Sequence, residues 1–149
     1  MILRWQSWTL LLGAILLISL AGARPAKGAA GELDESFGAG GVAVADLGQG
    51  GDRAWAIALQ EDGKIVTSGQ DPANGLSVLR FNSDGSLDTS FSDDGIFSTP
   101  AVRRGFDVIV RQDGKILATG SGDEHLVRLN NDGTLDATFN GDGITGSQF

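Results

Sequence analysis

The feature that most constrains this chain is an internal repeat. Residues 80–91 read RFNSDGSLDTSF and residues 128–139 read RLNNDGTLDATF, so one phrase occurs twice. Its last five residues, Leu-Asp-x-(Ser/Thr)-Phe, also occur at residues 33–37. A second phrase, Asp-Gly-Lys-Ile, begins at Asp62 and again at Asp113. A period of about 50 residues indicates an array of similar supersecondary units rather than one irregular fold.

Each unit is predicted to form four β-strands. Residues 53–60 alternate bulky with small side chains, which is the two-residue period of a strand with a neighbour on each face, and Trp55 is expected in the core. Asp-Gly turns precede the third strands, and Asn-Gly or residues 121–124 reverse the chain after them. The predicted strands are residues 42–46, 53–60, 64–69 and 76–81 in the first unit, with 96–99 and 115–120 among their counterparts in the second.

The repeated phrase is interpreted as a connector between units. Asp84-Gly85 turns the chain at the end of a strand, because Gly tolerates positive φ and Asp hydrogen-bonds its own backbone. Leu87 and Phe91 are four residues apart, so a single helical turn would direct both into the core. Asp88 is placed to accept hydrogen bonds from the free amides of that turn. The copy at the second unit is expected to repeat this arrangement.

Two arginines precede these turns at equivalent positions. Arg80 is followed by Asp88, and Arg128 by Asp136, at the same spacing. A bidentate guanidinium–carboxylate pair would brace each connector. The alternative is that both arginines are solvated at the ends of their strands.

The charge balance limits the partners of the chain. It holds 19 acidic and 11 basic residues, for a net charge of -8, and every acidic residue lies after residue 31. Nucleic acid is not expected as a partner, because phosphate binding needs clustered Lys and Arg. The absence of cysteine excludes disulfides and thiolate metal sites.

The clustered Asp side chains raise the possibility of a calcium site. Their carboxylates are the oxygen donors that calcium prefers. No stretch matches an EF-hand loop or a glycine-rich calcium repeat, and turn and capping roles explain the same residues. We therefore expect structural turns and no cofactor, with calcium as the alternative. The candidate metal ligands are Asp84, Asp88, Asp132 and Asp136, with Asn82, Asn130, Asp93, Asp94 and Asp142 nearby.

The N-terminal segment is typical of a signal peptide. Arg4 precedes an apolar run at residues 9–20, and the small residues Ala21 and Ala23 follow. A transmembrane anchor would need about 20 apolar residues, so no stable membrane anchor is expected. The protein is predicted to be exported to the periplasm, the cell surface or the medium. The predicted division is signal peptide 1–23, linker 24–31 and repeats 32–149, with units at about 33–86 and 87–134 and a partial unit at 135–149.

The repeated phrases resemble a known family. DGKIVTSG, LRFNSDGSLDTSFSDDG, DGKILATG and VRLNNDGTLDATFNGDG are similar to the delta-60 repeat, and the similarity extends over roughly residues 32–143. The resemblance implies a bacterial, exported β-propeller with no established general activity. Propellers close with about 4 to 8 blades. The expected fold is therefore all-β, with two four-stranded antiparallel blades and the start of a third, forming an incomplete propeller.

The function expected from these features is a structural or binding role without catalysis. Expected partners are a second copy, other repeat blades, or a cell-surface protein or glycan. The last residues, 144–149, are predicted to pair with another copy or to stay loosely ordered, because no hairpin follows them.

Two other functions remain open. One is a calcium-stabilised cell-surface module, and the other is a propeller-type hydrolase or lyase that uses an Asp pair such as Asp93 and Asp94. His125, the single histidine, replaces Ser77 of the other unit, which can mark a site. No second histidine, cysteine or nucleophile motif accompanies it, so a partly exposed strand residue is the simpler interpretation.

Overall fold

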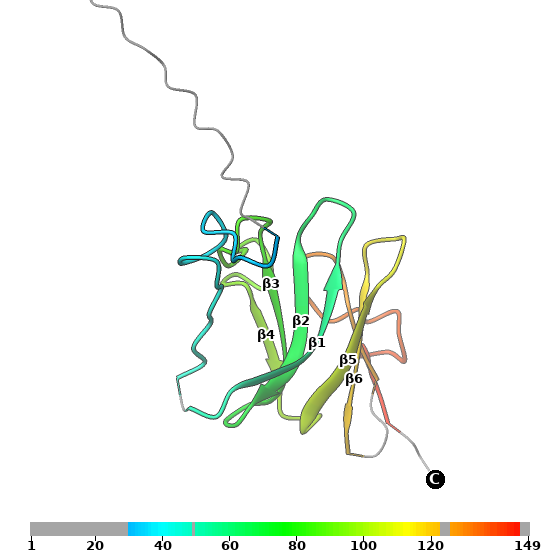
Figure 1. Ribbon diagram of the computed structural model, residues 1–149. Coiled ribbons are helices and arrows are strands. Elements are labelled where there is room, and N and C mark those ends of the chain that lie inside the picture. The colour runs from blue at the N-terminus through cyan, green and yellow to red at the C-terminus, as the bar shows by residue number, and fades with distance from the viewer. Residues whose placement is uncertain (1–29, 49, 123–125, 147–149) are drawn as a thin grey trace, which may run out of the picture.

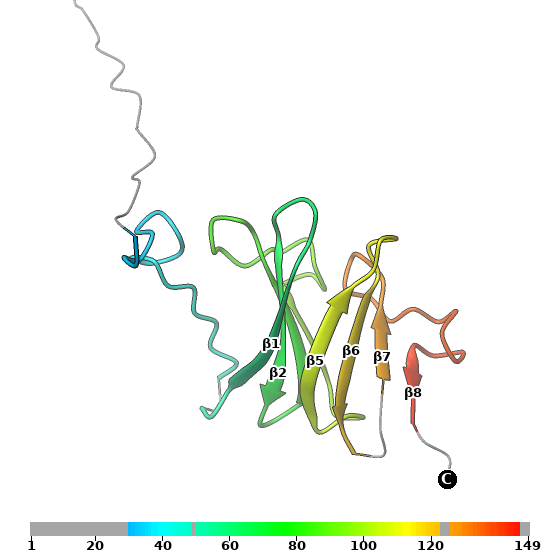
Figure 2. The same cartoon turned by 45° about the vertical axis from the view of Figure 1, so that its right-hand side comes forward.

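The chain is all-β in the residues that the computed structural model describes, 30–48, 50–122 and 126–146. The first sheet contains β1 (Arg53–Leu59), β2 (Ile65–Asp71), β3 (Gly75–Phe81) and β4 (Ile96–Thr99), and the second contains β5 (Arg104–Val110), β6 (Ile116–Ser121), β7 (Leu126–Leu129) and β8 (Ile144–Thr145). All neighbouring strands are antiparallel. The sheets stand side by side, and β5 lies against β1 and β2 (Figures 1 and 2). The predicted fold class of two four-stranded blades is confirmed.

The alternation of side chains in β1 decides which of them reach the core. Ala58 is opposite Val66 of β2, and both lie on the face that packs against the second sheet. Ile57 and Leu59 point to the other face, because side chains alternate along a strand. They are 67% and 72% exposed there, so only the face with small side chains is covered.

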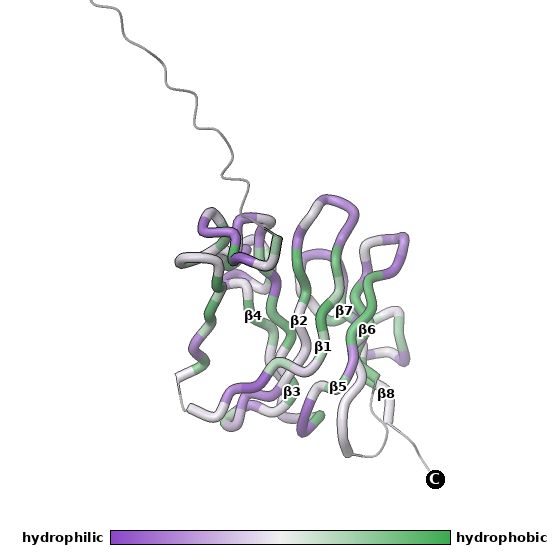
Figure 3. The backbone as a smooth tube through the Cα atoms, in the orientation of Figure 1, coloured by the Kyte–Doolittle hydropathy of each residue, from purple (hydrophilic) through white to green (hydrophobic). Residues whose placement is uncertain are grey.

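The hydrophobic core fills the space between the two sheets. It combines one face of each sheet with Phe91, from the segment between β3 and β4, and Val102, from the segment that links the two sheets. Burial of one such side chain stabilises the fold by about 1.5–3 kcal/mol. Figure 3 shows hydrophobic residues along the strands and hydrophilic residues in the turns at their ends. The other buried members of the core are Val66, Leu76, Val78, Val108, Ile116, Ala118, Val127 and Leu129.

Each sheet also has a face that no strand of the described residues covers. Ile57 of the first sheet is opposite Thr67, and Ile109 of the second sheet, which is 51% exposed, is opposite Leu117. These positions face away from the shared core. We call them the open face of the first sheet (Ile57, Leu59, Ile65, Thr67, Leu79 and Phe81, of which Leu79 and Phe81 are nonetheless buried) and the open face of the second sheet (Ile109, Leu117, Thr119 and Leu126).

Residues 42–46 do not form the predicted first strand. Val42 makes only an isolated bridge with Gly38, and Val44 is 80% exposed. The reason lies in the counterpart of this segment, β4, which pairs with β3 as the outer strand of the first sheet and does not begin the second. By repeat position, residues 42–46 therefore correspond to an outer strand. The third strand to which they would pair is not among the described residues.

The prediction for the end of the chain is corrected in the same way. β8 pairs with β7 of its own sheet, with Ile144 opposite Val127 and Thr145 opposite Leu126. It occupies the outer position that β4 occupies in the first sheet, so it is neither unpaired nor loosely placed. Residues 147–149 lie outside the described residues.

Trp55 was expected in the core, and this prediction is wrong. Its side chain is 37% exposed and that of Phe106 is 50% exposed. Each lies at a bulge, between Ala54 and Ala56 in β1 and between Gly105 and Asp107 in β5. A bulge adds one residue to an edge strand and redirects its side chain. The two rings contact each other instead, with centroids 6.1 Å apart.

Some predictions fall on residues outside the described ones. These are the signal peptide at 1–23 and most of the linker, His125, and part of the turn at 121–124. Within the described residues, no segment is an apolar helix with the length that a membrane crossing requires.

Candidate functional site

Three connectors are built on the repeated Leu-Asp-x-(Ser/Thr)-Phe phrase. In each, the Phe amide donates to the Asp carbonyl at 2.8–2.9 Å, and a closing Gly amide donates to the Phe carbonyl at 2.7–2.9 Å. These are two successive turns, so the predicted single helical turn is wrong. We name them the first connector (residues 33–41), the second connector (87–95) and the third connector (135–143).

In the second connector, two cations hold Asp88. Arg80 Nε and Lys64 Nζ donate to its Oδ2 at 2.6 and 2.7 Å. The Ser90 hydroxyl and amide donate to its Oδ1 at 2.6 and 3.1 Å. Burial of Asp88 opposes its ionisation, but the hydrogen bonds from Lys64 and Ser90 and the charge of Arg80 outweigh burial. They hold the pKa of Asp88 well below its usual range.

The third connector repeats this arrangement at Asp136. Arg128 Nε and Lys115 Nζ donate to its Oδ2 at 2.6 and 2.7 Å, and Thr138 takes the place of Ser90. The hydrogen bonds from Lys115 and Thr138, together with the Arg128 charge, hold the pKa of Asp136 below its usual range. The predicted arginine–aspartate pairs are confirmed.

The predicted bidentate geometry of these pairs is wrong. In each pair only the guanidinium Nε contacts the carboxylate, and a lysine shares the same oxygen. Each guanidinium also lies over an aromatic ring, with the Cζ of Arg80 4.8 Å from the Phe91 centroid and that of Arg128 4.5 Å from the Phe139 centroid. We call each cluster of one Lys, one Arg and one Asp (Lys64, Arg80 and Asp88; Lys115, Arg128 and Asp136) a clamp. Each clamp positions the connector's aromatic ring as well as its carboxylate.

The first connector lacks this clamp. Asp34 accepts hydrogen bonds from the Ser36 amide and hydroxyl at 3.0 and 2.6 Å, as its counterparts do from Ser90 and Thr138. Among the described residues, no Lys or Arg forms an ion pair with it. The first connector thus has the internal structure of the other two, but no Lys or Arg of the described residues anchors it to a sheet.

Two of the connectors also join the sheet that follows them. The Ser92 amide of the second connector donates to the Asp132 carbonyl of the second sheet's turn at 2.7 Å, and the Gly38 amide of the first connector donates to Asp84 in the same way at 2.7 Å. Phe91 is fully buried beneath this turn, and a Cβ built on Gly133 would come within 2.9 Å of its ring. We call this backbone hydrogen bond from a connector amide to an Asp carbonyl in a turn of the following sheet the joint. The third connector makes no joint within the described residues.

Arg80 connects the clamp to the next sheet. Its Nη1 donates to the backbone carbonyl and to Oδ1 of Asn131, which lies in the turn after β7. Its side chain is 4% exposed, whereas the Arg128 side chain is 20% exposed. No acceptor for the Nη1 of Arg128 is present in the described part of the chain. A turn that would offer Arg128 a carbonyl equivalent to that of Asn131 is not among the described residues.

The predicted metal ligands lie in two kinds of position. Asp88 and Asp136 are in the clamps, whereas Asp84 and Asp132 are exposed in turns. Asp84 Oδ1 accepts from the Ser86 hydroxyl and amide at 2.6 and 2.9 Å, and these hydrogen bonds lower its pKa. In the described residues, no three His, Asp or Glu side chains converge in a way that would hold a metal ion.

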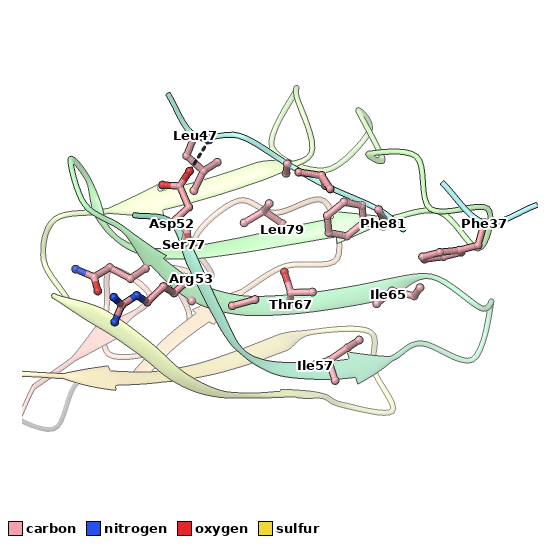
Figure 4. A pocket seen from close by; sticks show the side chains of 16 residues that line it. Phe37, Leu47, Asp52, Arg53, Ile57, Ile65, Thr67, Ser77, Leu79 and Phe81 are labelled. Atoms are coloured by element: carbon pink, nitrogen blue, oxygen red, sulfur yellow. Dashed lines mark hydrogen bonds between the residues drawn. The ribbon is translucent and has the colours of Figure 1, made fainter. Parts of the chain in front are cut away.

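A hollow of about 370 Å³ lies over the open face of the first sheet. Figure 4 shows Ile57, Ile65 and Leu79 on strands of the first sheet, and Ala43, Val44, Ala45 and Leu47 also line the hollow. The dashed bond in Figure 4 joins the Leu47 amide to Asp52 Oδ2 at 3.1 Å and holds the end of that segment. The hollow is therefore a mostly apolar space lined by one face of the first sheet and by a segment that forms no strand with the described residues.

Sequence reasoning missed Lys64, Lys115 and Asn131 as functional residues. The two lysines had a signal, because each follows Asp-Gly in the second repeated phrase. Asn131 had none, because its counterpart one unit earlier is Ser83. Its role depends on the packing of one sheet on the next.

Comparison with known proteins supports this reading of the fold. Two segments, residues 60–91 and 111–139, match the family model of a domain of unknown function described as DUF5122 beta-propeller. No similar curated protein and no similar solved structure was found. The matched segments contain both lysine–arginine–aspartate clamps up to the Phe of each connector. These two segments are therefore similar to a β-propeller domain family.

Proposed function

We propose that this chain is an exported interaction module of the delta-60 type, without catalytic activity, that binds a neighbouring β-sheet through its open faces. One observation carries the proposal. The interface between the two sheets joins one face of the first sheet to the opposite face of the second, and no strand of the described residues packs on the repeat-equivalents of these faces. A surface that packs once inside the chain is complementary to the surface left open at the other end.

The exposed side chains of the open faces support binding. Ile57 and Leu59 occupy the repeat positions of Val108 and Val110, which contact the first sheet from the second. An exposed cluster of large apolar side chains is typical of an interaction surface. The same side chains therefore favour a β-rich partner.

The carboxylates of the clamps support a structural role. Each already accepts hydrogen bonds on both oxygens, from two cations and a hydroxyl. A carboxyl whose pKa is held below its usual range stays ionised near neutral pH and so cannot act as a general acid there. These residues hold connectors in place.

The test compares the native protein in the exported fraction with two charge variants. Ile57→Lys places a charge on the open face of the first sheet, and Gln112→Lys adds the same charge in an exposed turn. We expect the wild type and Gln112→Lys to elute in complexes larger than one chain, and Ile57→Lys to shift to the monomer. A monomer in all three samples would contradict the proposal.

Export is tested on the same samples by intact mass. We expect a chain that has lost residues 1–23, as a cleaved signal peptide predicts. Recovery of the protein outside the cytoplasm with Met1 still present would contradict the expected cleavage. Its retention in the cytoplasm would contradict export.

A further inference from the structure

We propose that the partner is a second copy of this chain, joined head to tail by exchange of the first connector and its outer strand, residues 33–46. This segment would replace residues 135–146 on the second sheet of the neighbouring copy. The inference rests on the proposed function and names its partner. It follows from comparing what each of the three connectors contacts.

A complete connector makes two attachments, and among the contacts of the described residues only the second connector has both. It is anchored to the preceding sheet by the clamp on Asp88, and it is joined to the next sheet by the Ser92–Asp132 bond. The third connector has the anchor on Asp136 without the joint. The first connector has the joint from Gly38 without the anchor.

The two incomplete connectors are complementary. If the first connector of one copy takes the place of the third connector of another, Asp34 enters the clamp of Lys115 and Arg128. The Gly38 joint to Asp84 stays as it is. Both attachments are then satisfied by one segment, so the second sheet of one copy stacks on the first sheet of the next. Exchange of equivalent elements between copies needs no new type of contact.

The outer strands favour the exchange as well. Residues 42–45 read Val-Ala-Val-Ala and have no partner strand among the described residues, whereas the equivalent residues after Gly143 begin Ile-Thr-Gly. β8 is accordingly only two residues long. Branched side chains favour strands and Gly weakens them. Residues 42–45 are thus the better strand for the edge of β7 that the two-residue β8 now occupies.

The hollow, and the Arg128 Nη1 that has no acceptor among the described residues, are both consistent with this arrangement. The second sheet of the neighbouring copy would lie between residues 43–47 and the open face of the first sheet, where the hollow now is. Arg128 of that copy would then face the turn at Ser83, which is the counterpart of Asn131. Its Nη1 would gain the backbone acceptor that Arg80 finds at Asn131.

Because the faces differ, the interface is head to tail. Such an interface repeats until a ring closes, or continues as a filament.

The exchange is tested by disulfide cross-linking, since the chain has no cysteine of its own. Val42 is the counterpart of Ile144, which is opposite Val127. Val42→Cys and Val127→Cys are made as separate single variants of the full chain, mixed and oxidised. A cross-link between them is necessarily between copies. We expect a disulfide-linked dimer on a non-reducing gel.

The matched control pairs Val42→Cys with Leu79→Cys. Leu79 is the counterpart of Val127, but β4 already occupies the position opposite it. We expect no cross-link with Leu79→Cys, and loss of the Val127 cross-link when Asp34→Ala is added but not when Glu35→Ala is added. Should Val127→Cys fail to fold, Ala43→Cys with Leu126→Cys reads the adjacent pair.

The outcomes separate the exchange from the proposed function. Absence of the specific cross-link, or equal cross-linking at Leu79, overturns the exchange. If complexes larger than one chain persist in that case, the interaction module stands with another partner. If only monomers remain and Ile57→Lys changes nothing, both proposals fail.

Discussion

The Ser92 amide donates a 2.7 Å hydrogen bond to the Asp132 carbonyl and so joins the connector of the first sheet to the turn of the second. The same bond occurs between Gly38 and Asp84. All three residues at the donor position, Gly38, Ser92 and Asn140, have positive φ, at 56°, 52° and 52°. Because this conformation is uncommon for non-glycine residues, its recurrence indicates a shared structural role. The joint is the element by which one unit positions the next.

The clamp predicts a large difference between two arginine variants. Arg80→Ala leaves Asp88 buried without its guanidinium, and removing one partner of a buried pair costs about 3–5 kcal/mol. Arg111→Ala breaks an exposed pair with Asp113, whose side chains are 50% and 45% exposed, and should cost under about 1 kcal/mol. Urea unfolding of both variants measures the difference. Equal midpoints would mean that the clamp does not stabilise the fold.

The lowered pKa of Asp88 predicts how its stability contribution depends on pH. Its pKa is below the ordinary value of 3.8 in the folded chain, so the unfolded chain binds the proton more readily. The contribution is therefore complete at neutral pH and is lost as the pH falls from about the ordinary carboxyl pKa toward the lower folded value. Asp88→Asn should flatten this part of the stability profile. Glu35→Gln, at an exposed residue, is the control, and a profile unchanged by Asp88→Asn would contradict the prediction.

Gly133 and Gly141 provide a matched pair for testing the joint. Both have positive φ, 87° and 90°, so alanine is strained at either position. A Cβ on Gly133 would come within 2.8 Å of the Ser92 amide nitrogen and 2.9 Å of the Phe91 ring, whereas a Cβ on Gly141 meets nothing within 4 Å. We expect Gly141→Ala to cost about 1 kcal/mol and Gly133→Ala to cost about 1–3 kcal/mol more. Thermal unfolding of both variants measures it, and equal losses would show that the turn does not press on Phe91.

Ser68 predicts a stabilising substitution. Its side chain is fully buried between the sheets, and its hydroxyl has no hydrogen-bond partner among the described residues. An unsatisfied buried polar group costs about 1–3 kcal/mol. Ser68→Ala should therefore raise the unfolding free energy by about 1 kcal/mol. A decrease in urea unfolding would show that the hydroxyl has a partner in solution.

Local patterns were enough to predict most of the strands. The strand at β1, the Asp-Gly turns and the Asn74-Gly75 reversal each depend on neighbouring residues, and each was confirmed. The neighbour expected on each face of β1 was not, because Ile57 and Leu59 are exposed. The arginine–aspartate pairs were also predictable, because both members recur at one spacing. The strands, turns and ion pairs that occur in both units could therefore be predicted from the repeated residues.

The failed predictions depend on contacts between units. Whether residues 42–46 pair as a strand depends on a neighbouring third strand, and the exposure of Trp55 depends on a bulge in β1. Asn131 receives Arg80 only because the second sheet packs beside the first. Sequence periodicity carries no signal for such contacts between adjacent units.

Amide hydrogen exchange tests the central claim most directly, which is that the connector joint holds adjacent units together. Ser92 and Asn140 occupy the same repeat position, but only the Ser92 amide has an acceptor among the described residues. At a concentration low enough to keep the chain monomeric, the account predicts slow exchange at Ser92 and fast exchange at Asn140. Equal exchange rates at the two amides would contradict it.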